Sequence, residues 1–182
     1  MTNEIIVKDA NILIDLFHTG LYGKIASMKL RFHTTQYVAT EIIRTDQRCL
    51  LESMKASGDL IVDEFEGDDL SELLLFFMDN NGRNNLSEAD CSVIFLARRL
   101  NCRLLTTDQK LKRVALEQGI EVNGFLWLTD RMVDTDVVTV EEMLKAMELY
   151  LKNNPRAPKE EVNKRIENYT KIINDTAFCL YD

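Results

Sequence analysis

The sequence predicts an α/β fold: a three-layer α/β/α sandwich with a mostly parallel central sheet, plus a C-terminal helical extension. Short apolar runs alternate with amphipathic runs over residues 1–125, which is typical of a parallel sheet covered by helices on both faces. Beyond Gly124 the strand pattern stops and helical periodicity continues. Two prolines and seven glycines among 182 residues make a long disordered linker unexpected. We therefore expect a domain over 1–125 and a helical extension over 126–182, packed on that domain or on a partner.

The predicted strands are short, and they are either apolar or alternate between apolar and polar residues. The first stops at an acid, Asp9, and a helix starts at once. The last follows a turn at Gly119 and is expected at an edge of the sheet. The first four segments are residues 5–8, 31–35, 60–65 and 103–106, and residues 119–122 are the turn into the fifth.

The predicted helices begin directly after strands or at capping residues, and they end at glycines or polar turns. Gly20 to Gly23 break the first helix, and Ser87 opens a long helix with an apolar face. The polar stretch 79–85 predicts a loop. The helical segments are residues 10–17, a short helix up to 30, 36–44, a further helix up to 55, 68–78, 87–100, 108–118, 139–151 and 158–173.

Composition excludes several classes of protein. A formal net charge of −8 argues against a general coat of Lys and Arg that binds nucleic acid, but it does not exclude a nuclease with bound cations. No apolar run reaches the ~18 residues of a membrane span, and the N-terminus lacks a signal pattern, so we expect a cytoplasmic protein. The four cysteines lie at least eleven positions apart, which excludes a CxxC motif and indicates buried, reduced thiols.

Four acids lie where such a fold builds its site: Asp9, Glu41, Asp90 and Asp108. Asp9 and Asp108 each follow a predicted strand directly, so both are expected at the same edge of a parallel sheet. Asp90 lies in the first turn of the helix before the Asp108 strand, and Glu41 follows the second strand within two turns. Four carboxylates gathered there would repel one another, and divalent cations such as Mg²⁺ remove that repulsion. We interpret the four acids as a metal site.

Each acid also has a structural interpretation, which is the stronger one when the acid is taken alone. Asp9 and Asp108 precede helices and could cap them. Ser87 and Asp90 match a capping box, and Glu41 could be a solvated helix residue. Only the gathering of all four at one edge favours metal binding.

Four stretches together resemble the PIN domain family, over about residues 4–125. They are Asp9-Ala10-Asn11-Ile12-Leu13, the helix with Glu41, Leu86-Ser87-Glu88-Ala89-Asp90 with 91–97, and Leu104-Leu105-Thr106-Thr107-Asp108. The later stretch 122–128, with the two helices beyond it, is similar to the C-terminal part of another bacterial branch of that family, of unassigned activity. The chain is longer than the compact toxins of the family.

The resemblance implies a metal-dependent hydrolase that cleaves RNA phosphodiester bonds with Mg²⁺ or Mn²⁺. Asn11 would orient the Asp9 carboxylate, and Glu88 is a fifth acid that ranks below Asp90 because the two do not share a helix face. The best-known bacterial members are VapC-like toxins, so the expected partners are RNA, an antitoxin protein and a second copy of the chain, with no membrane. The expected metal ligands, which are also the catalytic residues, are Asp9, Glu41, Asp90 and Asp108.

The expected chemistry is hydrolysis by a water whose pKa the metal lowers, which needs no protein nucleophile. The nearest basic residues that could hold phosphates are Arg83, Lys110, Lys112 and Arg113, of which Lys112 is better interpreted as a solvated helix residue. Thr106 and Thr107 could bond a phosphate, but hydroxyls before a helix are more often caps. Phe125 and Trp127 are interpreted as core residues.

Two other functions stay open. The first is a module of the same fold that binds RNA or a protein with little catalysis. The second is a phosphotransfer or phosphatase domain, which usually has two acids close together after the first strand. Here Asp9 and Asn11 supply one acid at that place, so the second function has weak support.

Overall fold

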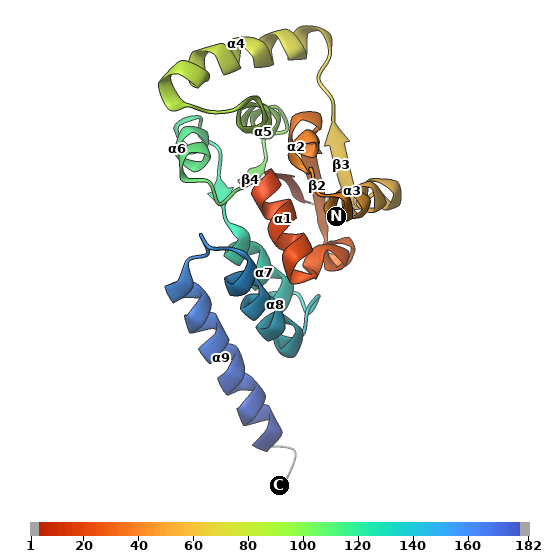
Figure 1. Ribbon diagram of the computed structural model, residues 1–182, viewed down its shortest axis with the longest axis vertical. Helices are drawn as coiled ribbons and strands as arrows, with labels where there is room; N and C mark the ends of the chain where they lie inside the picture. Colours follow the sequence, from red (N-terminus) through yellow and green to blue (C-terminus); the bar gives the residue numbers. More distant parts are fainter. Residues whose placement is uncertain (1–3, 179–182) are drawn as a thin grey trace. The chain divides into compact units, whose positions relative to one another are not determined.

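The structure is a computed structural model that describes residues 4–178 (Figure 1). The chain forms two compact units. The first comprises the chain up to Ile14 together with Lys29–Phe125, and the second comprises Asp15–Met28 together with the chain from Leu126 onwards. Helix α1 (Ala10–Thr19) therefore contributes its first half to one unit and its second half to the other.

A five-stranded, all-parallel sheet forms the centre of the first unit, which confirms the predicted fold class. The strand order is β3-β2-β1-β4-β5, so the first strand lies in the middle. The strands are β1 (Glu4–Lys8), β2 (Leu30–Thr35), β3 (Leu60–Asp63), β4 (Arg103–Leu105) and β5 (Val122–Asn123).

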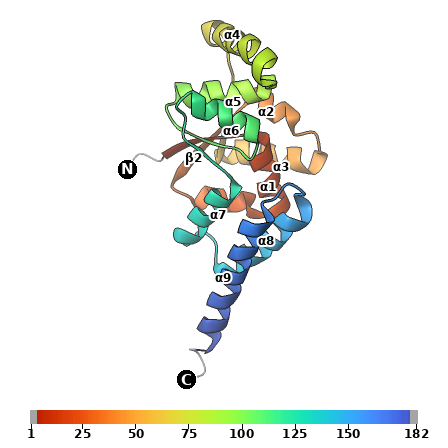
Figure 2. The ribbon, with the colours of Figure 1, turned by 90° about the vertical axis from the view of Figure 1, so that its left-hand side faces the viewer.

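Helices cover both faces of this sheet because parallel connections are right-handed. The chain moves outward from β1 to β3 and then back across to β4, so the connecting helices change face. The helices of the first unit, besides the start of α1, are α2 (Gln36–Glu41), α3 (Thr45–Ser57), α4 (Gly67–Asn84), α5 (Glu88–Arg99) and α6 (Gln109–Glu117). Figure 2 shows α5 and α6 on one side of the sheet and α1 and α3 on the other.

The core of this unit follows from the strand register. Ile6 of β1 is paired with Phe32 of β2, which is paired with Leu60 of β3, and all three side chains are buried. On the opposite face lies α5, which packs on β1, β2 and β4 and is buried from 91 to 97. A helix that is apolar on nearly all sides is expected to be surrounded by protein.

The second unit is helical. Arg165 pairs with Asp130 through two hydrogen bonds of 2.8 and 2.5 Å, and Tyr150 and Val162 are buried where α8 (Val140–Asn153) and α9 (Lys159–Phe178) pack together. The amphipathic tail helices therefore bury apolar residues within this unit. Its remaining elements, after the second half of α1, are the 3-10 helix η1 (Leu21–Ser27), α7 (Phe125–Asp134), α8 (Val140–Asn153) and α9 (Lys159–Phe178).

Some boundaries differ from the prediction. The stretch 79–85 was expected to be a loop, but α4 continues to Asn84. Asparagine side chains stabilise this last turn: Asn80 Nδ2 donates to the Phe76 carbonyl (2.8 Å), and Asn84 Nδ2 donates to Asn80 Oδ1 (2.9 Å). The helix then ends at Asn85, which has a left-handed backbone (φ 52°). In contrast, α2 ends three residues before the predicted boundary, at Glu41.

The thiols are only partly as expected. Cys91 is buried and Cys102 is half-buried, whereas Cys49 is exposed, so the expectation of a buried thiol is wrong there. Cys179 lies outside the described residues. Within residues 4–178, no helix combines the length and the apolar character that a bilayer span requires.

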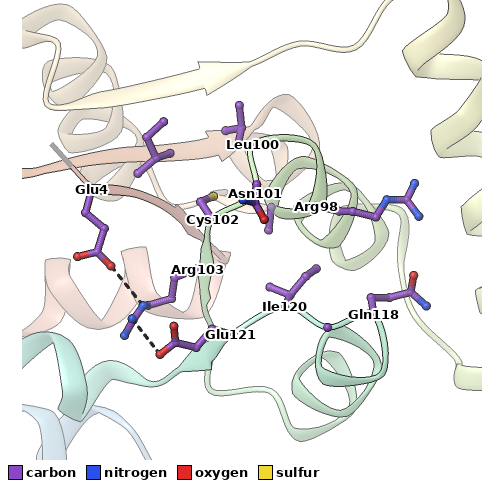
Figure 3. A pocket seen from close by; sticks show the side chains of 12 residues that line it. Glu4, Arg98, Leu100, Asn101, Cys102, Arg103, Gln118, Ile120 and Glu121 are labelled. Atoms are coloured by element: carbon purple, nitrogen blue, oxygen red, sulfur yellow. Dashed lines mark ion pairs between the residues drawn. The ribbon is translucent and has the colours of Figure 1, made fainter. Parts of the chain in front are cut away.

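An arginine joins three strands at the amino-terminal edge of the sheet (Figure 3). Arg103 at the start of β4 forms ion pairs with Glu4 (3.5 Å) and Glu121 (2.9 Å) and donates to Asn123 Oδ1 (2.8 Å). A cavity of about 480 Å³ lies beside it, between the ends of α5 and α6. This edge is the opposite end of the strands from Asp9. The positive charge of Arg103 is paired with these two carboxylates, so we assign it a role in stabilising the fold.

We expect Arg103→Gln to lower the free energy of unfolding by about 1–2 kcal/mol, because a half-buried, charge-assisted network is lost. Chemical denaturation measures this change. The control is Lys55→Gln, which removes an exposed pair with Glu52 and should cost less than about 0.5 kcal/mol. Equal losses in the two variants would contradict the structural role of Arg103.

Candidate metal centre

The carboxyl-terminal edge of the sheet gathers side chains from four elements. Lys8, the last residue of β1, is paired with Leu105, the last residue of β4. The residues that follow, Asp9 and Thr106, are therefore neighbours, and the Asp9 amide continues the ladder to the Leu105 carbonyl (3.1 Å). In a parallel sheet such residues emerge together. The sequence predicts Asp108 beside Asp9, but β4 ends at Leu105, so Thr106 takes that place and Asp108 lies two residues further on.

Asp9 is the central side chain of this edge, and it is only 3% exposed. Its Oδ1 accepts a hydrogen bond from the Ala10 amide (2.6 Å). Its Oδ2 accepts from Thr106 Oγ1 (2.8 Å) and from Asn11 Nδ2 (3.1 Å), and the second of these is the orienting contact that the family resemblance implies. Three donors therefore fix the orientation of the Asp9 carboxylate.

The Asp9 carboxylate nevertheless ionises with difficulty. Burial raises its pKa from 3.8 to about 6, and the charge of Asp90 adds to this rise, although the hydrogen bonds from Thr106, Ala10 and Asn11 oppose it. Lys8 does not act as a counter-ion. Its Nζ lies 3.5 Å from the centroid of the Phe32 ring, and burial lowers the pKa of this amine well below its usual value.

Asp90 occupies the first turn of α5, in the capping box that the sequence predicts. Ser87 Oγ accepts from the Asp90 amide (3.1 Å), and Asp90 Oδ2 accepts from the Ser87 amide (2.9 Å). Its charge also acts on two other carboxylates, because it raises the pKa of both Asp9 and Glu41. Asp90 therefore caps a helix and also acts electrostatically on two further acids.

Glu41 is the last residue of α2, and its side chain is exposed. Partial burial raises the pKa of Glu41, and the charge of Asp90 contributes to this rise. The charge of Asp90 thus acts on two other predicted acids, Asp9 and Glu41, whereas neither of these two raises the pKa of the other. Glu88 is exposed and is not among the groups that raise the pKa of Asp9 or Glu41.

Asp108 has a different position. Its Oδ1 accepts from the amides of Lys110 (2.8 Å) and Leu111 (2.9 Å), so its side chain caps α6. It is linked to the other acids through one hydroxyl: Thr106 Oγ1 accepts from the Asp108 amide (3.0 Å) and donates to Asp9. Asp108 does not contribute to the raised pKa of Asp9 or Glu41.

Thr106 is the residue whose role the sequence did not identify. It was expected to be a cap, but its single hydroxyl connects Asp9 to the start of α6. The signal was present, because Thr106 directly follows a strand that ends beside β1.

A pair of hydroxyls joins the helices that present Glu41 and Asp90. Thr35, at the start of α2, lies 2.7 Å from Ser92 of α5, measured between their hydroxyl oxygens, and both residues are fully buried. Ser92 Oγ donates to the Ala89 carbonyl (2.7 Å), so the Thr35 hydroxyl donates to Ser92. Thr35 Oγ1 in turn accepts from the Val38 amide (3.3 Å). This chain of bonds fixes α2 against α5.

The donor chemistry of this edge fits a hard divalent cation. Asp9, Glu41 and Asp90 supply only oxygen atoms, and the pKa values of Asp9 and Glu41 are raised by burial and by a neighbouring carboxylate, which a bound cation would reverse. Among the described residues, no group of three or more His, Cys, Asp or Glu side chains is close enough to hold a metal ion by itself. Mg²⁺ commonly uses one or two carboxylates with waters and substrate phosphate, so these residues are compatible with it.

Comparisons with known proteins give a family for this chain. The model of the PIN domain family matches residues 5–171, which supports a general nuclease role. A search of curated proteins found no match. A solved structure, the crystal structure of PAE2754 from Pyrobaculum aerophilum, is similar, with 20% identity, 74% of this chain and 92% of that chain covered, and a TM-score of 0.49.

Because burial raises the pKa of Asp9 to about 6, the folded chain binds more protons than the unfolded chain between pH of about 4 and 6. We expect the free energy of unfolding to fall by up to about 3 kcal/mol as pH rises through this window without divalent cations. Denaturant titrations at several pH values measure this slope. Asp9→Asn should flatten it, whereas Asp46→Asn should not, because the pKa of Asp46 is lowered. A slope that persists in Asp9→Asn would contradict the assignment.

We expect Ser92→Ala to lower the free energy of unfolding by about 1–3 kcal/mol, because the buried Thr35 hydroxyl loses its acceptor. Thermal or chemical denaturation measures this loss. Ser71→Ala removes an exposed bond to the Gly67 carbonyl and should cost less than about 0.5 kcal/mol. A neutral Ser92→Ala would show that this bond does not hold α2 against α5.

Proposed function

Because this chain belongs to the PIN domain family, we propose that it is a divalent-metal-dependent nuclease that hydrolyses phosphodiester bonds of RNA. The observation that carries this proposal is the buried Asp9, whose pKa is raised by burial and by a second carboxylate, Asp90, at the edge where such folds bind ligands. A carboxylate kept in this environment is a candidate functional group.

In the proposed site, Asp9, Glu41 and Asp90 would hold Mg²⁺ or Mn²⁺, and Asp108 would complete the set from the N-terminus of α6. The cation would lower the pKa of a water and polarise the scissile phosphate. Asn11 and Thr106 keep the Asp9 carboxylate in one orientation through their hydrogen bonds. Such positioning is a recognised contribution of residues that surround a metal ligand.

No protein nucleophile is assigned. Burial and the neighbouring charge of Asp90 raise the pKa of the Cys91 thiol to about 12, so this thiol stays protonated. His33 Nδ1 lies 2.7 Å from Asp63 Oδ2, and both residues belong to the sheet. Neither Cys91 nor His33 is therefore assigned as a nucleophile, and the attacking group in the proposed reaction is water.

The biological role is proposed from the family resemblance alone. We propose a toxin of a toxin–antitoxin pair, with an antitoxin protein as partner and a homodimer as the assembly. Light scattering after size-exclusion chromatography tests the dimer.

A second candidate function is an RNA- or protein-binding module with little catalysis. The observation that favours it is that Asp90 and Asp108 both cap helices, and no ready group of three ligands exists among the described residues. The two functions differ in one measurable respect, because only the nuclease requires its acids for cleavage.

We expect Asp9→Asn and Asp90→Asn to reduce Mg²⁺-dependent RNA cleavage by more than about 100-fold, beyond the loss typical of residues that only support a metal ligand. Isothermal titration of Mg²⁺ and Mn²⁺ and a cleavage assay on labelled RNA measure this effect. Asp68→Asn, on the exposed first turn of α4, is the control.

Wild-type cleavage rates in Asp9→Asn would refute the metal site. Metal binding without cleavage of any RNA by the wild type would favour the binding module.

A further inference from the structure

We infer that the outer face of α6, together with the end of α4, is the surface that binds the RNA backbone beside the carboxylate site. This inference rests on the proposed nuclease function and names the residues that would hold its substrate. We call it the α6 basic surface, and it consists of Lys110, Lys112 and Arg113 of α6 and Arg83 of α4.

The sequence of α6 divides the helix into two faces. Leu111, Val114 and Ala115 are buried and hold the helix on its own unit. The residues between them point outward, and they include all three of its basic side chains. The exposed residues of α6 are Gln109, Lys110, Lys112, Arg113, Leu116 and Glu117.

Charge favours a phosphate ligand here. The chain as a whole has 30 acidic and 22 basic residues, but α6 carries three basic residues and one acid, Glu117. A local basic cluster on an acidic protein concentrates attraction for a polyanion at one place instead of over the whole surface.

Two connections place this surface next to the acids. Lys110 lies two residues after Asp108, which caps α6 and is linked through Thr106 to Asp9. One helical turn spans about 5.4 Å, so Arg113 lies roughly one turn further from the acids than Lys110. A phosphodiester backbone that follows α6 toward its N-terminus therefore arrives at the carboxylates.

The end of α4 contacts the α6 basic surface through a hydrogen bond. Arg113 Nη2 donates to Asn84 Oδ1 (3.0 Å), and Asn84 Nδ2 donates to Asn80 Oδ1 (2.9 Å). Six residues after Asn84 the chain reaches Asp90. The Arg113 side chain thus connects α6 to the end of α4, from which the chain leads to Asp90, and Arg83, the residue before Asn84, is exposed.

The shape of α6 also suits a nucleotide. A shallow hollow of about 430 Å³ lies along its outer face, lined by Gln109, Lys112, Arg113, Leu116 and Glu117. Leu116 is 52% exposed there although it is apolar. A base can contact the apolar Leu116 side chain while the neighbouring cations Lys112 and Arg113 bind phosphate.

The test is binding of a fluorescently labelled single-stranded oligoribonucleotide, followed by anisotropy over a series of salt concentrations, with EDTA to prevent cleavage. The test variant is Lys110→Gln, Lys112→Gln and Arg113→Gln together. For single strands each lost phosphate contact changes the slope of log K against log[salt] by about 0.7, so the triple variant should have a slope shallower by about 2.

The matched control is Lys145→Gln, Lys152→Gln and Lys171→Gln, which removes the same charge from exposed positions of the second unit. It should leave the slope within about 0.7 of the wild type. Circular dichroism confirms folding. If the triple variant does not fold, Arg113→Gln alone should reduce the slope by about 0.7.

An unchanged slope in the α6 variant, an equal loss in the control, or no binding by the wild type would each overturn this surface. The proposed function is judged separately, by metal-dependent cleavage and its loss in Asp9→Asn. Cleavage that depends on Asp9 together with an unchanged slope would keep the nuclease and reject the surface. In the expected case, the α6 variant cleaves with a raised KM and a kcat close to that of the wild type.

Discussion

The burial of Asp9 at the end of the central strand is the constraint on which the arrangement of this edge depends. Three hydrogen bonds favour the ionised carboxylate, whereas burial and the charge of Asp90 disfavour it. Burial has the larger effect, since the pKa of Asp9 rises to about 6. The surrounding donors fix where the carboxylate points without neutralising it. A buried carboxylate of this kind lowers the free energy of unfolding, and it is available to bind a cation.

Neutral hydroxyls, and not charges, hold the elements of this edge together. Thr106 connects Asp9 to the start of α6, and the pair of Thr35 and Ser92 connects α2 to α5. An arginine in these places would pair with the carboxylates and compete with a metal. Where the chain does use an arginine to join strands, at Arg103, it does so at the opposite edge of the sheet, away from the acids.

In the first unit, acidic and basic side chains gather on different helices. The charge of Asp90 in α5 acts on Asp9 and on Glu41 of α2, while the exposed face of α6 is basic, within a chain of net charge −8. The link through Asp108 and Thr106 makes these two regions neighbours. This arrangement supports the proposal that the chain is a nuclease and binds its substrate through a small basic surface instead of a broad one.

The sequence alone determined the alternation of strands and helices, a mostly parallel sheet and the candidates Asp9, Glu41, Asp90 and Asp108, because short-range periodicity and strand ends are visible in the order of residues. It also determined the capping box of Ser87 and Asp90, which depends on residues three positions apart. Only the tertiary structure decided which acids share a field. Asp108 lies three residues after the end of its strand, and its carboxylate caps a helix, while Glu41, forty-nine positions from Asp90, is affected by the charge of Asp90. Electrostatic interaction depends on distance and burial in space, and for residues far apart in sequence those are set by how α2 and α5 pack.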